Sequence, residues 1–211
     1  MTYRLYGDNS SGAAMVEAAL AEIGEPFEVI PIDLHKDAQR GADYLAINPA
    51  GKIPALRDAK GRVLTESAAI LIALAEWHPD ARLLPPAGSF ARAEAIRWLV
   101  HVNTEMYPMI EIRDYPARFV EGEAAGKALV ARAIARLRER WLGVEKAVAG
   151  APWLLADGFS IADLAIGCVS RWAVGKEWRA ENCPRIEALN TAIFERPRAG
   201  PVWKRHFSWT L

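Results

Sequence analysis

Glu66 and Ser67 lie side by side in the stretch LTESAAILIALAEW, where an apolar run with helical spacing begins. The hydroxyl of Ser67 and the backbone N–H groups of a first helical turn can receive a carboxylate, as helix N-termini do for anions. Glu66 can accept hydrogen bonds from an ammonium group, so the pair has the chemistry to hold an amino-acid head group. By itself the pair is explained more simply as a helix start, because Thr65 or Ser67 can cap and a carboxylate gains from the helix dipole.

The stretch NPAGKIPAL, from Asn48 to Leu56, has two prolines around a Gly-Lys pair. A proline pushes the preceding residue into an extended conformation, and an X-Pro bond is where a cis peptide costs least. A cis Ile53–Pro54 bond would turn the backbone of Ile53 outward, where its N–H and C=O can pair with an extended peptide. On spacing alone, an ordinary turn before an edge strand is the simpler interpretation.

Ser10 and Ser11 precede an Ala-rich segment that ends at Gly24, a pattern typical of a helix and its C-terminal cap. As helix caps the two serines need no further function. As functional groups they would place a hydroxyl donor at the positive end of a helix. That environment favours a thiolate and lowers the pKa of a thiol from about 8.5.

The composition excludes several classes of function. The chain has 26 basic and 26 acidic side chains in 211 residues, so it lacks the basic excess of a nucleic-acid-binding protein. Its histidines have no HxxxH or HExxH spacing, and we expect no metal site. There is no secretory signal or bilayer-spanning apolar run, and Cys168 and Cys183 form no CxxC pair. We therefore expect a reduced, cytoplasmic protein that binds neither nucleic acid nor membrane.

The elements that must position these residues change in character along the chain. Residues 1–78 predict the order β-α-β-α-β-β-α, which is compatible with a small mixed sheet flanked by helices. Residues 79–88 are rich in proline and lack periodicity, which is typical of a linker. Residues 89–211 have helical patterns only. The predicted architecture is an α/β domain followed by an all-α domain.

Taken together, NPAGKIPAL followed by LTESAAILIALAE resembles the glutathione transferase family in order and spacing. The stretch GFSIADLAI is similar to the family's buried capping box, an S-x-x-D pattern from Ser160 to Asp163. The resemblance covers essentially the whole chain. It implies a thioredoxin-like N-terminal domain plus an all-α C-terminal helical domain, a homodimer, and glutathione as co-substrate without a metal.

The resemblance also implies which residues bind glutathione. Ile53 would pair its backbone with the cysteinyl part, and Pro54 would be the cis-proline of the family. Glu66 and Ser67 would hold the amino and carboxylate groups of the γ-glutamyl part. Lys52 would lie where family members often contact the glycyl end.

The resemblance places the thiol-activating hydroxyl at Ser10 when Gly24 is aligned with the glycine that ends the first helix. Ser11 is the next candidate, and Tyr6 or the backbone alone are further alternatives. Two features depart from the family pattern. Gly12 and Ala13 stand where Pro or Cys usually follows the serines, and the helix lacks an early arginine.

In the family the helical domain supplies a hydrophobic pocket for the second substrate. NTEMYPMIEIRDYPARF resembles the bacterial branch, and the candidate wall residues, for which core packing is an equal explanation, are Met106, Tyr107, Tyr115 and Trp172. The implied activity is conjugation of the glutathione thiolate to a small hydrophobic electrophile, as in detoxification. The alternatives are a glutathione-dependent isomerase, peroxidase or dehalogenase on the same fold, or a non-catalytic binding or regulatory protein.

Overall fold

The computed structural model describes residues 2–172 and 174–210, which form two compact units. The first unit comprises residues up to Leu84 together with Ile193–Trp209, and the second runs from Pro85 to Ala192. The division after Leu84 falls inside the stretch predicted as a linker. The end of the chain differs from the prediction for residues 89–211, because the last helix buries its aromatic side chains in the α/β unit.

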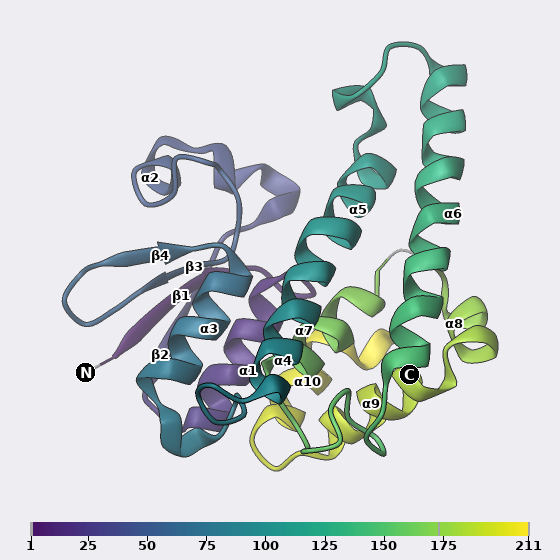
Figure 1. Cartoon of the computed structure of the whole chain (residues 1–211). Helices are drawn as coiled ribbons and strands as arrows, with labels where there is room; N and C mark the ends of the chain where they lie inside the picture. The colour runs from purple at the N-terminus through teal and green to yellow at the C-terminus, as the bar shows by residue number, and fades with distance from the viewer. Residues whose placement is uncertain (1, 173, 211) are drawn as a thin grey trace. The chain divides into compact units, whose positions relative to one another are not determined.

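A four-stranded mixed sheet forms the centre of the first unit (Figure 1). Its strands, in the spatial order β2-β1-β3-β4, are β1 (Tyr3–Gly7), β2 (Phe27–Pro31), β3 (Ala55–Arg57) and β4 (Val63–Thr65). β1 and β2 are parallel, whereas β3 is antiparallel to both β1 and β4. This sheet confirms the mixed arrangement predicted from the sequence.

Helices cover both faces of the sheet. Helices α1 (Ala13–Ile23) and α3 (Ser67–Trp77) pack together on the face to which the buried Leu5 points. Because neighbouring residues of a strand point to opposite faces, Tyr6 lies on the other face, where its ring is 6.2 Å from that of Tyr44 in α2 (Ala42–Leu45). The unit also contains α10 (Ala199–Phe207) and short 3-10 turns at Leu34–Lys36, Ala38–Arg40 and Pro79–Ala81. A further 3-10 turn, Ser208–Thr210, follows α10.

Two glycines define the ends of α1. Gly24 ends the helix in a left-handed conformation, with φ 83°, and its N–H donates to the carbonyl of Leu20 at 3.0 Å. At the other end, a Cβ atom on Gly7 would lie 2.2 Å from the Cβ of Ala13. Glycine at position 7 therefore lets β1 approach the start of α1 closely, and this approach positions the Ser10–Ser11 loop.

The second unit is built from helices, as the sequence predicts. Its helices are α4 (Phe90–His101), α5 (Tyr107–Asp114), α6 (Glu123–Ala147), α7 (Ile161–Ser170), α8 (Lys176–Asn182) and α9 (Pro184–Glu195), the last of which continues into the first unit. A π-helical turn, Val102–Met106, joins α4 to α5, and Pro116–Arg118 forms a 3-10 turn. Helix α7 is buried along its whole length and forms the core of this unit.

The start of α7 has the predicted capping box. The Oγ of Ser160 accepts from the backbone N–H of Ala162 at 3.3 Å, and Oδ2 of Asp163 accepts from the N–H of Ser160 at 2.7 Å. The other oxygen of Asp163 accepts from the N–H of Leu154 at 2.7 Å. Burial raises the pKa of Asp163 to about 6, although these hydrogen bonds oppose the shift. One buried carboxyl group thus joins the start of α7 to the preceding loop.

Candidate functional site

The Ile53–Pro54 peptide bond is cis, as the resemblance implied. The loop that leads to it is fixed at the carbonyl of Lys52, which accepts from Tyr44 Oη at 2.8 Å and from Asn48 Nδ2 at 2.6 Å. Burial raises the pKa of Tyr44 to about 12, so its hydroxyl stays protonated and remains a donor at neutral pH. The side chain of Lys52 is exposed, while its backbone is held from two sides.

Glu66 and Ser67 form the start of α3, but without a side-chain cap from Glu66. Glu66 is exposed and has φ 66° and ψ 115°, whereas Ser67 is buried. A non-glycine residue with positive φ is uncommon, and such a conformation costs on the order of 1–3 kcal/mol. Backbone outliers of this kind cluster at functional sites. The outlier therefore supports a functional interpretation of Glu66 over the capping interpretation.

The register of the sheet brings three sequence stretches to one edge. Thr65 of β4 and Tyr6 of β1 both pair with Ala55 of β3, and both strands run antiparallel to β3. Pro54 directly precedes Ala55. The segments that follow β1, toward Ser10, and β4, toward Glu66, therefore begin next to Pro54. The stretches that follow β1 and β4, which are more than fifty residues apart in the sequence, thus lie at the same edge.

The loop before α1 is bound to the C-terminal segment. Ser10 has φ 55°; its N–H donates to Nδ1 of His206 at 2.9 Å, and its hydroxyl donates to the carbonyl of His206 at 2.6 Å. The indole N–H of Trp209 donates to the Oγ of Ser10 at 3.2 Å. The Ser10 hydroxyl therefore already has a donor and an acceptor interaction within this unit.

Ser11 has a different environment. Its hydroxyl donates to the carbonyl of Asp8 at 2.7 Å and accepts from the N–H of Ala13 at 3.2 Å. The residue is buried, whereas Ser10 is partly exposed. These contacts give Ser11 the role of a cap for α1, although the helix begins formally after Gly12.

The sequence interpretation missed Glu17 and His206. Glu17 is 3% exposed in the middle of α1, and its carboxylate contacts His206 and Arg205. Burial alone would raise the pKa of Glu17, but the hydrogen bonds from His206 and Arg205 outweigh it and hold the pKa below its ordinary value. An acid in the middle of a largely apolar helix was the available signal, but it did not indicate which partner it meets.

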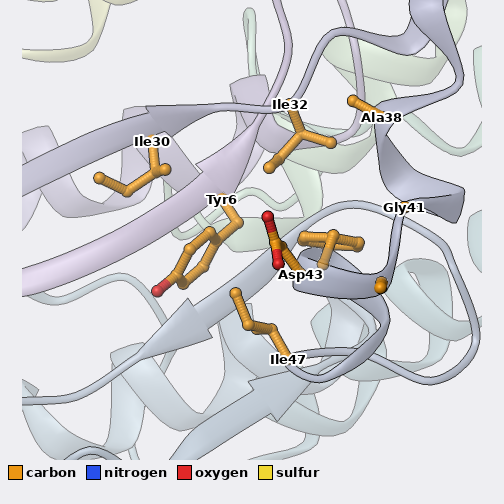
Figure 2. Close-up of a pocket in the computed structure, with 9 residues that line it drawn as sticks. Tyr6, Ile30, Ile32, Ala38, Gly41, Asp43 and Ile47 are labelled. Atoms are coloured by element: carbon orange, nitrogen blue, oxygen red, sulfur yellow. The ribbon is translucent and has the colours of Figure 1, made fainter.

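A cavity of about 480 Å³ lies between the sheet and α2 (Figure 2). It is lined mainly by apolar side chains and by the backbone before α2, from Tyr6, Ile30, Ile32, Ala38, Gly41, Ala42, Asp43, Tyr44 and Ile47. The ring of Tyr6 thus belongs to the α2 face of the sheet, whereas α1 packs on the opposite face. This placement favours the serines over Tyr6 as the group beside a sulfur at the start of α1.

The four candidate pocket residues of the second unit have three different environments. Met106 is fully buried. Tyr107 and Trp172 meet edge to face with ring centroids 5.4 Å apart, and the carbonyl of Trp172 accepts from Arg113 at 2.8 Å. Tyr115 is half exposed under the guanidinium of Arg118. The structure therefore brings together Tyr107 and Trp172 but leaves Tyr115 at the surface.

The remaining candidate features are metal ligands, membrane-spanning helices and the two cysteines. Within residues 2–172 and 174–210, His, Cys, Asp and Glu side chains form no group of three that could hold a metal ion. The same part of the chain has no helix long and apolar enough to cross a membrane. Cys168 and Cys183 are both buried, and burial raises the pKa of Cys183 to about 12, which keeps that thiol protonated.

Comparisons with known proteins agree with this fold. Residues 9–77 match the family model of the glutathione S-transferase N-terminal domain. The chain is 33% identical over 179 residues to glutathione S-transferase GstA of Escherichia coli O157:H7, covering 84% of this chain and 86% of that relative. The chain therefore belongs to the glutathione S-transferase family.

Two further relatives illustrate the range of the family. A crystal structure of a glutathione transferase homolog from Sulfitobacter with bound glutathione has a TM-score of 0.87 and 25% identity, over 95% of this chain and 96% of that one. Maleylacetoacetate isomerase of Rhizobium meliloti (strain 1021) is 34% identical over 119 residues, which are 56% of this chain and 54% of that relative.

Proposed function

We propose that the protein binds glutathione at the edge of the sheet beside Pro54 and transfers its thiolate to a small hydrophobic electrophile. The observation that carries the proposal is the strained backbone of Glu66 next to the β3–β4 pairing, which puts an exposed carboxylate and a helix start beside Ile53. The relatives named above, one of which has bound glutathione, support the same conclusion.

Each part of glutathione has a matching group at this edge. The backbone of Ile53 pairs with the cysteinyl part as an added strand would. Ser67 and the N–H groups of the first turn of α3 receive the γ-glutamyl carboxylate, and Glu66 accepts from its ammonium group. The exposed side chain of Lys52 contacts the glycyl carboxylate in this proposal.

The sulfur lies at the start of α1, where the helix dipole stabilises a thiolate. Ser10 is the proposed hydroxyl donor, because it is partly exposed whereas Ser11 is buried and caps the helix. To donate to sulfur, the Ser10 hydroxyl turns away from the carbonyl of His206. The thiolate then forms a C–S bond with the electrophilic carbon, and the leaving group departs with the bonding electron pair. Holding the two reactants together supplies much of the rate.

A glutathione-dependent isomerase is the second candidate, favoured by the similarity to maleylacetoacetate isomerase. It uses the same thiolate but expels it after the rearrangement, so no conjugate accumulates. A homodimer and a cytoplasmic location remain further predictions from the resemblance, and light scattering after size-exclusion chromatography tests the first.

The test combines binding and turnover. Calorimetry with glutathione should show binding for the wild type and for Ser10→Ala, while Ser10→Ala conjugates a generic aryl halide about 10- to 100-fold more slowly. Ser11→Ala is the matched control and should mainly lose stability. Full conjugation by Ser10→Ala with glutathione still bound would contradict the role of Ser10. Absence of glutathione binding by the wild type would contradict the proposal as a whole.

A further inference from the structure

Ser10 is held in a left-handed conformation by a residue almost at the other end of the chain. Both its backbone N–H and its hydroxyl are bonded to His206, at 2.9 Å and 2.6 Å. A serine with φ 55° persists only where the surroundings compensate for the strain. The His206 side chain and carbonyl supply two such bonds to this loop.

The geometry assigns the tautomer of His206. Its Nδ1 accepts from the N–H of Ser10, so the ring hydrogen lies on Nε2, which donates to Oε2 of Glu17 at 2.8 Å. Both side chains are almost completely buried, and Arg205 contacts the second oxygen of Glu17. Glu17 therefore orients the imidazole, and the imidazole orients the backbone of Ser10. The arrangement is a relay of hydrogen bonds from the middle of α1 to the loop at its start.

Helix α10 is anchored to α1 independently of this relay. Arg196, before α10, makes two hydrogen bonds to the carboxylate of Glu22, at 2.9 Å and 2.8 Å. The N–H of Ala199 donates to the same carboxylate at 3.0 Å. Trp203 and Phe207 are fully buried within the unit. A change at His206 can thus alter the loop while α10 stays in place.

We propose that His206 is a positioning residue for the thiol-activating loop, acting through the hydrogen bond from the Ser10 N–H to its Nδ1. This inference rests on the proposed function, because the position of Ser10 matters to catalysis only if the sulfur of glutathione lies beside it. His206 is buried, so in this proposal it acts through the loop and not by contact with either substrate. Its effect falls on the turnover number, since glutathione is held by Ile53, Glu66 and Ser67.

Two substitutions separate positioning from stability. The side-chain oxygen of asparagine, like Nδ1 of histidine, is bonded to Cγ, so His206→Asn keeps the acceptor for Ser10 and loses the donor to Glu17. The amide nitrogen of glutamine lies as far along the side chain as Nε2, so His206→Gln keeps the donor to Glu17 and loses the acceptor for Ser10. Arg196→Gln is the control that weakens the α10 anchor without touching the relay.

The experiment measures kcat, the KM for glutathione and the urea midpoint of the full-length variants. His206→Gln should have a kcat at least about 10-fold below that of His206→Asn, with KM changed less, because a misplaced group can cost up to about 100-fold. The order of the urea midpoints should be reversed, since His206→Asn leaves the buried Glu17 with one partner fewer. Arg196→Gln should lower the midpoint and keep kcat.

The proposal is overturned if kcat follows the urea midpoint across the three variants, or if His206→Gln keeps the wild-type kcat. The ¹⁵N chemical shifts of the His206 ring are an independent readout, and a hydrogen on Nδ1 would also overturn it. If Ser10→Ala is fully active while His206→Gln is slow, the hydroxyl role in the proposed function fails, but positioning of the loop backbone stands.

Discussion

The starts of α7 and α3 combine the same two kinds of side chain, a serine and an acid, with opposite results. At α7, Ser160 is extended, with φ −145°, and exchanges hydrogen bonds with the fully buried Asp163 three residues later. At α3, the acid precedes the serine directly, and Glu66 is exposed in a strained conformation without a side-chain cap. A spacing of three closes a capping box, whereas adjacency cannot. The first start caps its own helix, whereas the second presents an exposed carboxylate, which we propose to contact a ligand.

The start of α1 differs from the starts of both α7 and α3. Ser10 is strained like Glu66, but its partners come from α10 and the turn after it. The strain at α3 lies in an exposed residue, while that at α1 is compensated by a distant segment. Positive φ thus marks the two starts that we propose to bind glutathione, whereas Ser160 at the start of α7 is extended.

The largest expected effect is the loss of stability when the capping box at the start of α7 is removed. Asp163→Ala removes the acceptor of the Leu154 and Ser160 N–H groups in a fully buried place, and we expect the free energy of unfolding to fall by about 2–5 kcal/mol. Urea unfolding measures the loss. Glu66→Ala is the matched change at α3 and should cost less than about 1 kcal/mol. Similar losses in the two variants would remove the distinction.

The pH dependence of the free energy of unfolding tests the same carboxyl group at the start of α7. Asp163 in the folded protein has its pKa raised to about 6, while in the unfolded chain it titrates near 3.9. The stabilisation from its retained proton is complete below about pH 4 and is lost as the pH rises through about 6, by roughly 3 kcal/mol in total. Urea unfolding from pH 4.5 to 7.5 should show this slope in the wild type relative to Asp163→Asn. Parallel curves for the two proteins would contradict it.

The smallest expected effect tests the proposed role of Glu66, at the start of α3, in binding glutathione. Glu66→Gly removes the ammonium acceptor and relieves the positive φ, so we expect glutathione to bind about 10- to 100-fold more weakly while stability is unchanged or rises by up to about 1 kcal/mol. Glu66→Ala keeps the strain and should lose affinity to the same extent without the gain in stability. Calorimetry and urea unfolding measure the two quantities. If Glu66→Gly binds glutathione as the wild type does, the carboxylate has no role in binding.

Much of the fold could be predicted because it depends on local pattern. The order of strands and helices up to Trp77 and the capping box at Ser160 follow from periodicity, turn residues and short-range hydrogen bonds. The Ile53 and Glu66 stretches were also recognisable, because each is a short motif with its chemistry in adjacent residues. Their meeting at one edge required the pairing of β3 with β4 and β1.

The surroundings of Ser10 could not be predicted in the same way. Its partner His206 is 196 residues away, and the partner of Glu17 is 189 residues away. No periodicity links such positions, because the contact exists only when α10 packs on α1. For the same reason the end of the chain was predicted in the helical domain, although Trp203 and Phe207 of α10 are buried in the α/β unit.

The sequence by itself determined the elements and the family, and it supplied the groups that we propose for the two ends of a glutathione molecule, since these depend on neighbouring residues and their backbone preferences. Only the tertiary structure decided that the Ser10 hydroxyl is bound to His206 and that Tyr6 belongs to the face with α2. The physical reason is that one hydroxyl or imidazole group can form hydrogen bonds with many different partners. Long-range packing of apolar helices selects which partner it meets.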